Sequence, residues 1–271
     1  MNKKKGYYSF SQLNTFNNCP QKYKLLYIDN IKKKDESIEG YLGKTVHEVL
    51  EWVYNNKFEY CVWDKIENKY EELWDKNWHC DIYISIIKRQ YNKNHFKKIG
   101  LECLRNYYKN QGGPYLKYDH IISTEVVVET RIGEYKFKGI IDRLDENEDS
   151  INIHDYKTGK PKSQLMMNKD LQLVIYLLAI QKKRKTKKII LNWHFLKHPK
   201  IQKQHIRITK NQAEIENNKK DIIKNVEQIV KAKKNKDFPP NENFLCNWCY
   251  LWEYCTYKKQ YNEINPSINA N

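Results

Sequence analysis

Two aspartates and a lysine in the middle of the chain have the residue types and spacing of a metal-dependent hydrolytic site. Asp142 stands in Ile140-Ile-Asp-Arg-Leu-Asp145, and Asp155 and Lys157 stand in Ile151-Asn-Ile-His-Asp-Tyr-Lys-Thr-Gly159. Two neighbouring carboxylates repel each other unless a cation lies between them. Mg²⁺ suits this place, because it prefers a few carboxylate oxygens plus a substrate phosphate. A bound metal can also activate a water, which Lys157 would orient.

The elements that carry these residues are predicted to be two short strands joined by the acidic turn Glu146-Asn-Glu-Asp149. Side chains two residues apart on a strand share a face, so Asp155 and Lys157 should project to the same side. Asp142 should end the neighbouring strand. The alternative is a surface hairpin with an ordinary Asp–Lys pair, which contributes under about 1 kcal/mol to stability.

A helix predicted over residues 43–53 carries a histidine beside its apolar stripe. The stripe consists of Val46, Val49, Leu50 and Val53, at the spacing of a buried helix face. His47 lies about 100° round from Val46, at the edge of the stripe, where a side chain can reach a site beside the core. Taken alone, a histidine in this position is more often structural than a ligand.

A second helix, predicted over residues 170–182, follows the two strands. Gln172 and Tyr176 are one turn apart and face the same way. Further helices are predicted at 9–18, capped by Ser9 or Ser11, at 21–27, and from a cap at Thr209 to about residue 234. Strands are predicted at 124–132, 135–144, 151–156, 189–195 and 204–208. Strands followed by helices in this order indicate an α/β protein.

Three of the seven cysteines are gathered late in the sequence. Cys246-x2-Cys249-x5-Cys255 has a short metal-binding spacing, and Cys19 could supply a fourth thiolate from the N-terminal region. A buried thiol explains one cysteine but not three within so short a stretch. Zinc and an iron–sulfur cluster both accept four thiolates, and the spacing does not separate them. Either would clip the two ends of the chain together, because metal binding contributes folding free energy.

The composition favours a polyanionic partner. The chain has 49 Lys and Arg against 33 Asp and Glu, a formal net charge of +16, with 21 Tyr and 7 Trp that are compatible with base stacking. A lysine excess can also follow from coding bias. No apolar run follows residues 1–5, and the longest one, residues 171–180, is too short to span a bilayer. We therefore expect a cytoplasmic protein without a membrane partner, with its cysteines as metal ligands or buried thiols.

At 271 residues, the chain is predicted to form one domain. Residues 58–111 should be a helical insert, since they are rich in Trp, Tyr and Lys and show no strand alternation. Residues 238–260 should form a C-terminal cysteine segment that packs with Cys19. No phosphate-binding Gly-x-x-x-x-Gly-Lys-Ser/Thr motif is present, so any unwinding of a duplex would need a helicase partner.

Several short motifs together resemble the PD-(D/E)XK nuclease superfamily, in particular its RecB-like branch. That branch includes bacterial RecB/AddB-type nuclease domains and CRISPR-associated RecB-like nucleases. The matching pieces are Ser9-x-Ser11 through Cys19-Pro20 with Tyr23, Gly43-x-x-x-His47, Gly139-x-x-Asp142-Arg143, Asp155-Tyr-Lys-Thr-Gly159 and Gln172-x-x-x-Tyr176. They follow the family's order and span nearly the whole chain. Each piece is weak by itself, whereas the combination is specific.

The resemblance implies a role for each motif residue. His47, Asp142, Asp155 and the carbonyl of Tyr156 would bind Mg²⁺ or Mn²⁺, and Lys157 would be the catalytic lysine. The remaining implied roles are DNA contact for Gln172 and Tyr176, support from the first strand for Glu125, and a [4Fe–4S] cluster, or alternatively Zn²⁺, on Cys19, Cys246, Cys249 and Cys255.

The expected fold is a restriction-endonuclease-like α/β core: a central mixed sheet flanked by helices, with the helical insert and iron–sulfur-stapled termini. The expected function is a metal-dependent DNA nuclease, an exonuclease on single-stranded or frayed ends in recombination, repair or phage-like DNA processing. One alternative is a CRISPR-adaptation nuclease that trims spacer precursors with an integrase. Two others are a non-catalytic, cluster-stapled DNA-binding subunit and a zinc-stapled RNA-binding module.

Overall fold

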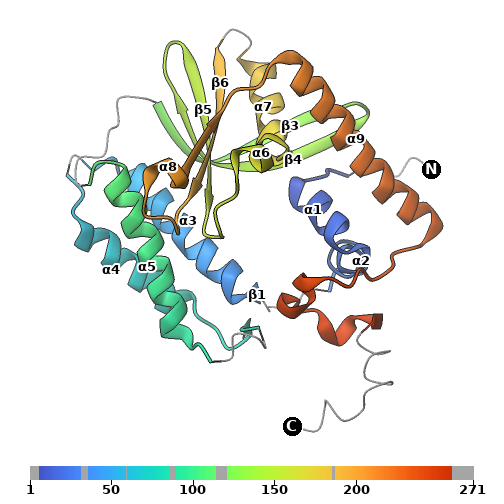
Figure 1. The fold of residues 1–271 in the computed structure, drawn as a ribbon, viewed down its shortest axis with the longest axis horizontal. Helices are drawn as coiled ribbons and strands as arrows, with labels where there is room; N and C mark the ends of the chain where they lie inside the picture. Colours follow the sequence, from blue (N-terminus) through green and yellow to red (C-terminus); the bar gives the residue numbers. More distant parts are fainter. Residues whose placement is uncertain are drawn as a thin grey trace.

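A five-stranded mixed sheet forms the centre of the chain in the computed structural model, which describes residues 6–31, 36–58, 60–85, 90–113, 121–184 and 187–257 (Figure 1). Its strands, in spatial order, are β3 (Ile121–Ile132), β4 (Tyr135–Glu146), β5 (Ser150–Lys157), β6 (Lys188–Phe195) and β7 (His205–Ile208). Only β5 and β6 run parallel; the other neighbours are antiparallel. The predicted α/β class with a mixed central sheet is confirmed.

Helices cover both faces of this sheet, and each face has its own apolar core. One face is covered by α1 (Phe10–Asn18), α2 (Pro20–Tyr27), α7 (Gln172–Lys183) and α9 (Gln212–Asn235). The other is covered by α3 (Ile38–Asn56), α4 (Trp63–Asn77) and α5 (Lys93–Asn110). The short helices α6 (Gln164–Asn168) and α8 (Ile201–Gln204) lie in connections. Figure 1 shows α3, α4 and α5 together on one side and α1, α2 and α9 on the other.

Two local predictions need correction. The described part of residues 58–111 forms α4 and α5, but it also contains the two-residue strand β2 (Ile82–Tyr83), which pairs with β1 (Glu36–Ser37). The long helix α9 is capped by Asn211, not by Thr209. The Asn211 side chain accepts the N–H of Glu214, and the Glu214 carboxylate accepts the N–H of Asn211, which together satisfy two helix-end donors. Of the predicted C-terminal segment, residues 258–260 lie outside the described residues.

The side-chain alternation of β4 breaks at Asp142. Ile141 and Leu144 pack in the same core, although residues three apart face opposite sides of a regular strand. Glu125, the cross-strand neighbour of Asp142, has a φ of +49°, and the β3–β4 pairing skips this position. A non-glycine residue in this left-handed region is uncommon and marks a local irregularity. Beyond it, β4 continues to Glu146, past its predicted end.

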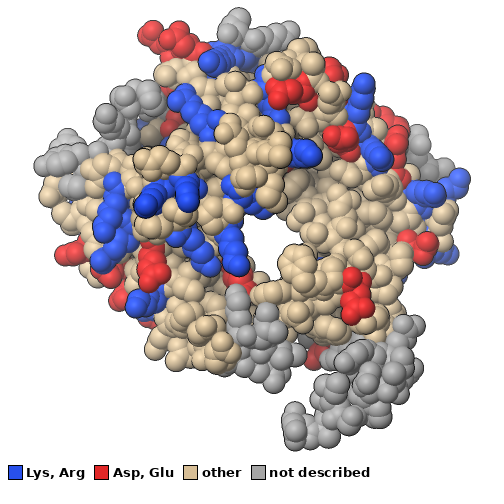
Figure 2. Space-filling view, in the orientation of Figure 1, with Lys and Arg blue, Asp and Glu red and all other residues tan. Residues whose placement is uncertain are grey.

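Basic side chains gather over one side of the molecule. Figure 2 shows them over the region of α5 and α8, where several border an opening between that side and the part formed by α1 and α2. The cations contributed by α5 and α8 include Lys97, Lys98, Arg105, Lys109 and Lys203. A surface of this kind attracts polyanions. Among the described residues, no helix is long and apolar enough to cross a membrane.

Candidate active site

The main chain of Tyr156 joins the three elements that carry the predicted metal ligands. Its N–H donates to Asp142 Oδ2 at 2.8 Å, and its carbonyl oxygen lies 3.0 Å from His47 Nε2. The other ring nitrogen of His47 lies 3.6 Å from Asp142 Oδ1. The structure therefore brings α3, β4 and β5 together at one residue, although α3 is far from both strands in the sequence.

Lys157 is held between a strand and a helix. Its Nζ lies 2.7 and 3.0 Å from the two carboxylate oxygens of Asp155, on the shared face that strand alternation predicts. The same ammonium donates to Gln172 Oε1 at 2.9 Å, and Gln172 Nε2 donates to the Tyr176 hydroxyl at 3.3 Å. Gln172, for which the resemblance implies contact with DNA, thus fixes the position of Lys157 in this structure.

Burial and neighbouring charges set the protonation of the acidic groups. Burial raises the pKa of Asp155 to about 6, with Asp142 adding to the rise and Lys157 opposing it. Burial also disfavours ionised Asp142, but His47 outweighs it and the pKa of Asp142 is lowered. Asp142 therefore loses its proton more readily than Asp155 does.

The basic groups respond in the opposite direction. Burial opposes protonation of His47 and Lys157, yet the pKa of each is raised because Asp142 acts on the histidine and Asp155 on the lysine. Each of these two basic groups therefore lies beside one carboxylate, Asp142 for His47 and Asp155 for Lys157.

Glu125 lies across the strand pair from Asp142. Burial raises its pKa, and Asp142 and Glu51 of α3 raise it further through their negative charge. Its left-handed backbone conformation costs free energy that the surrounding fold must offset, and such strain concentrates at functional sites. The Glu125 carboxyl is therefore close enough to Asp142 for the two groups to influence each other's ionisation.

Gly139 leaves room for the ring of Tyr176. A Cβ atom at residue 139 would lie 2.3 Å from Tyr176 Cε1, far inside van der Waals contact, and the ring is buried. Because the Tyr176 hydroxyl contacts Gln172, this close approach of strand and helix also places Gln172 on Lys157. Steric contact with Tyr176 thus explains why the Gly139-x-x-Asp142 motif has glycine at its first position.

Arg143 supports the site from the opposite face of the sheet, a role that the sequence reasoning missed. Its guanidinium donates to the hydroxyls of Tyr107 at 2.7 Å and Tyr156 at 3.1 Å, and to Asp145 Oδ2 at 3.0 Å. It also stacks over the ring of Tyr54, 4.2 Å from the centroid. An Arg and an Asp two residues apart in an apolar strand were the available clue, because buried charges are almost always paired.

Three histidines extend this buried network across the sheet. His154 and His194 stack with ring centroids 5.2 Å apart, and His194 stacks on His205 at 4.5 Å. Nδ1 of His154 lies 2.8 Å from Nε2 of His194, a distance that requires one nitrogen to be unprotonated. Burial lowers the pKa of His154 from its usual 6.5 to about 4, and it lowers that of His194 as well.

Residues 7–256 match the family described as the PD-(D/E)XK nuclease superfamily. The chain belongs to this superfamily. This match confirms the predicted family and the restriction-endonuclease-like fold. The reaction class of the superfamily is hydrolysis of phosphodiester bonds. Membership of the RecB-like branch stays a prediction.

Two solved structures resemble this nuclease. A putative exonuclease from Eubacterium rectale is 11% identical, with 97% of this chain and 94% of that one covered and a TM-score of 0.50, which shows a shared fold. The structure of SSO0001 is 16% identical, with 92% and 96% covered and a TM-score of 0.35. No curated protein matches the nuclease significantly.

The donor atoms of the nuclease suit a hard divalent cation only in part. Across the described residues, no three His, Cys, Asp or Glu side chains are gathered closely enough to hold a metal. However, His47 Nε2 and the Tyr156 carbonyl oxygen, which are 3.0 Å apart, would be nitrogen and oxygen donors for such an ion once Nε2 carries no proton. Asp155 Oδ2 is buried and has no hydrogen bond of good geometry, only its ion pair with Lys157. A metal ion that bound Asp155 would therefore have to share its carboxylate with Lys157.

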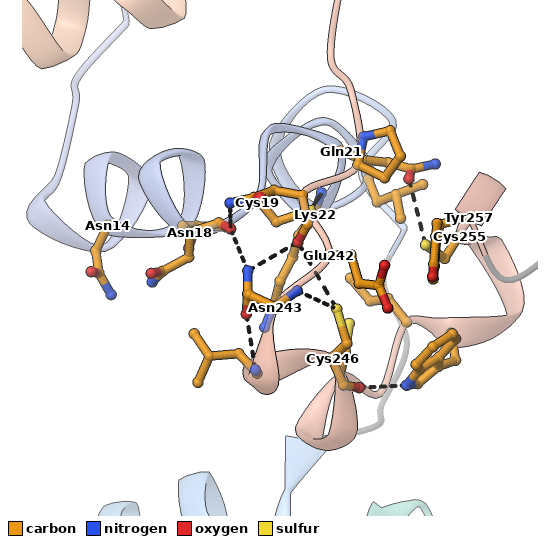
Figure 3. Close-up of a pocket in the computed structure, with 18 residues that line it drawn as sticks. Asn14, Asn18, Cys19, Gln21, Lys22, Glu242, Asn243, Cys246, Cys255 and Tyr257 are labelled. Carbon is orange, nitrogen blue, oxygen red and sulfur yellow. Dashed lines mark hydrogen bonds between the residues drawn. The ribbon is translucent and has the colours of Figure 1, made fainter.

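The four cysteines of the predicted cluster line one cavity of about 150 Å³, between α1, α2 and the 3₁₀ turns at Phe244–Trp248 and Trp252–Tyr254 (Figure 3). Two of their sulfurs accept main-chain N–H groups: Cys19 from Lys22 and Cys246 from Asn243, each at 3.5 Å. All seven cysteines are free thiols. The four cysteines line one space, but no three of the cysteines in the described part of the chain are close enough together to hold a metal.

Direct hydrogen bonds already join the two ends of the chain around this cavity. The side-chain amides of Asn241 and Asn243 donate to the carbonyl of Asn18 at 3.0 and 3.1 Å. The N–H of Gln21 donates to the carbonyl of Pro239 at 3.2 Å. The ends are therefore held by protein contacts as well as by any metal that binds.

The contact between Gly139 and Tyr176 predicts a steric cost. Gly139→Ala should lower the free energy of unfolding by about 1–3 kcal/mol, because the new methyl group overlaps a buried ring. Gly159→Ala is the matched control, since a Cβ there meets nothing within 4 Å, and it should change stability by less than about 0.5 kcal/mol. Urea unfolding measures both. Equal stabilities of the two variants would contradict the predicted overlap.

The buried histidines predict a loss of stability in mild acid. The pKa of His154 is lower in the folded chain than in the unfolded one, so the unfolded state binds more protons between pH 6.5 and 4. Stability contributed by neutral His154 and His194 is thus present above pH 6.5 and should fall by roughly 1–2 kcal/mol per pH unit below it. Urea unfolding from pH 7 to 5 measures the slope. His194→Gln should flatten it, while the exposed control His95→Gln should not; an unchanged slope in His194→Gln would refute the assignment.

Proposed function

We propose that this nuclease is a Mg²⁺- or Mn²⁺-dependent exonuclease that hydrolyses DNA at single-stranded or frayed ends. The observation that carries the proposal is that His47 and Asp142 meet at the main chain of Tyr156, with the Asp155–Lys157 ion pair on the two residues that flank it. Family membership supports the reaction class, and this arrangement supports these residues as the groups that carry it.

The proposed metal ligands are His47, Asp142, Asp155 and the Tyr156 carbonyl. A bound divalent ion would lower the pKa of a water and stabilise charge on the phosphate during attack. Lys157, held by Asp155 and Gln172, would orient that water or neutralise the phosphate. Asp142 would bind that ion as a carboxylate, and Arg143 would help to hold the Tyr156 carbonyl in place through the Tyr156 hydroxyl.

Charge and family resemblance support DNA as the substrate. The net charge of +16 and the cations around α5 and α8 favour a polyanion. The RecB-like resemblance favours action at ends, and the name of the Eubacterium rectale neighbour agrees with it. Exposed aromatic residues such as Tyr7 suit unpaired bases, which can stack on a ring.

We also propose that Cys19, Cys246, Cys249 and Cys255 hold a [4Fe–4S] cluster with a structural role, with Zn²⁺ as the alternative. All four line one cavity, and N–H groups directed at two of the sulfurs are typical of thiolates in clusters. A cluster would draw the sulfurs closer and add to the hydrogen bonds that already join the termini.

The catalytic proposal predicts a selective loss of cleavage. Asp155→Asn and Lys157→Ala should each reduce cleavage of end-labelled single-stranded DNA with Mg²⁺ or Mn²⁺ by roughly 10²-fold or more. Binding of the same DNA in EDTA should change little. Asp149→Asn, in the exposed turn before β5, is the control and should keep full activity. Full activity of either site variant would sink the mechanism.

The cluster proposal predicts bound iron. After anaerobic purification the protein should contain about four iron atoms per chain and should be brown. Cys246→Ala should lose most of the iron, whereas Cys80→Ala, at an exposed cysteine away from the cavity, should keep it. About one zinc per chain would favour the alternative. Stable protein with neither metal would contradict both.

A further inference from the structure

A groove of about 460 Å³ leads away from the candidate active site. It is lined by residues 7–12, residues 138–140, Asp142, Gln172 and Tyr176. Two of these belong to the candidate active site: Asp142 accepts the N–H of Tyr156, and Gln172 accepts a hydrogen bond from Lys157. Tyr176 supports Gln172 through its hydroxyl, whereas residues 7–12 and 138–140 have no part in the mechanism above.

The groove exists because one edge of β4 is only partly paired. β5 pairs with β4 from Arg143 onward. Further back, Tyr8 takes the place of a strand: its N–H donates to the Lys136 carbonyl at 2.8 Å, and its carbonyl accepts the Lys138 N–H at 2.9 Å. Between these two pairings, residues 139–142 have no strand partner on this edge among the described residues, and Tyr176 of α7 packs against Gly139 there. This stretch is framed by main-chain hydrogen bonds at both ends, so its shape is set by the sheet.

The side chains along this groove suit a nucleic-acid strand. The ring of Tyr7 is 45% exposed and Ile140 is 46% exposed, so both present apolar surface to solvent. The Tyr7 hydroxyl donates to Glu129 Oε2 at 2.8 Å, which holds the ring in place. Lys138, from the same strand as Asp142, is exposed. Lys136 Nζ lies 5.9 Å from the centroid of the Tyr7 ring, and Lys138 is two residues further along the same strand. A positioned aromatic ring with lysines near it is a pattern with which proteins bind an unpaired base and its phosphate.

We propose that this groove holds the unpaired DNA strand adjoining the scissile phosphate, with a base against Tyr7 and a phosphate at Lys138. This inference rests on the proposed function and extends it to a substrate-binding surface. A base inside a duplex has both faces covered by its neighbours, so it must leave the stack before it can lie against the ring. The groove thus gives the nuclease a structural reason to prefer single strands or frayed ends.

Binding in EDTA tests the groove separately from catalysis. Fluorescence anisotropy with a labelled single-stranded oligonucleotide should show that Tyr7→Ala weakens binding roughly tenfold, because a base loses its stacking partner. Tyr7→Phe keeps the ring and should retain most of the affinity. Lys138→Ala should weaken binding and reduce the slope of log affinity against log salt by ~0.7, the value for one phosphate on a single strand.

Matched controls carry the same side chains elsewhere. Tyr60 is 50% exposed and Lys188 begins β6, and neither lines the groove. Tyr60→Ala and Lys188→Ala should bind like the wild type. Photocross-linking with an iodouracil-substituted oligonucleotide should attach DNA at Tyr7. If the Tyr7→Ala and Lys138→Ala variants bind like the wild type, or if cross-links map elsewhere, the inference is overturned.

The outcomes separate the groove from the catalytic proposal. A wild-type protein that binds single strands through Tyr7 and Lys138 but cleaves no DNA with either metal would refute the proposed function alone. A protein that cleaves DNA while the groove variants keep full affinity would refute the groove alone. A wild-type protein with no affinity for single-stranded DNA would overturn the groove as well.

Discussion

The amide of Tyr156 depends on a carboxylate for its hydrogen bond, and the arrangement of the site follows from that dependence. Pairing between β4 and β5 begins only at Arg143 and His154, so the N–H of Tyr156 has no partner in the β4 main chain. The Asp142 side chain accepts it instead. A buried amide left without a partner costs about 1–3 kcal/mol, so the fold itself holds this carboxylate in place. His47 and Arg143 then fix the same residue through its carbonyl and its hydroxyl.

Local periodicity was enough to predict part of this site. Strand alternation placed Asp155 and Lys157 on one face, and the helical stripe of α3 placed His47 at its edge. Alternation could not place Asp142, because the rule fails where Glu125 adopts a left-handed conformation, and no local feature of the sequence marks a glutamate for that conformation. A regular period is informative only up to the point where the strand is irregular.

The sequence indicated which side chains share a face or a metal-binding spacing, but not which distant residues they contact. The motif spacing placed Gln172 and Tyr176 on one side of a helix, yet the contact with Lys157 depends on how α7 crosses β4, and that depends on Gly139. Similarly, the cysteine spacing indicated a metal, but it could not indicate that asparagine side chains bond across the two ends of the chain beside the shared cavity. The expected Thr209 cap was wrong for a smaller reason: Asn211 and Glu214 can satisfy each other's main-chain groups.

The meeting of the two termini also limits how this chain can fold during synthesis. Phe16 of α1 packs in one core with Val226 and Ile229 of α9, and Gln21 bonds to Pro239. Ribosomes add about 5–20 residues per second, so the first helices wait roughly 10–50 s before these partners emerge. Through that interval, apolar side chains of α1 and α2 lack much of the surface that covers them. The nascent chain therefore has a period of exposure to chaperones that a fold with an independent N-terminal unit would avoid.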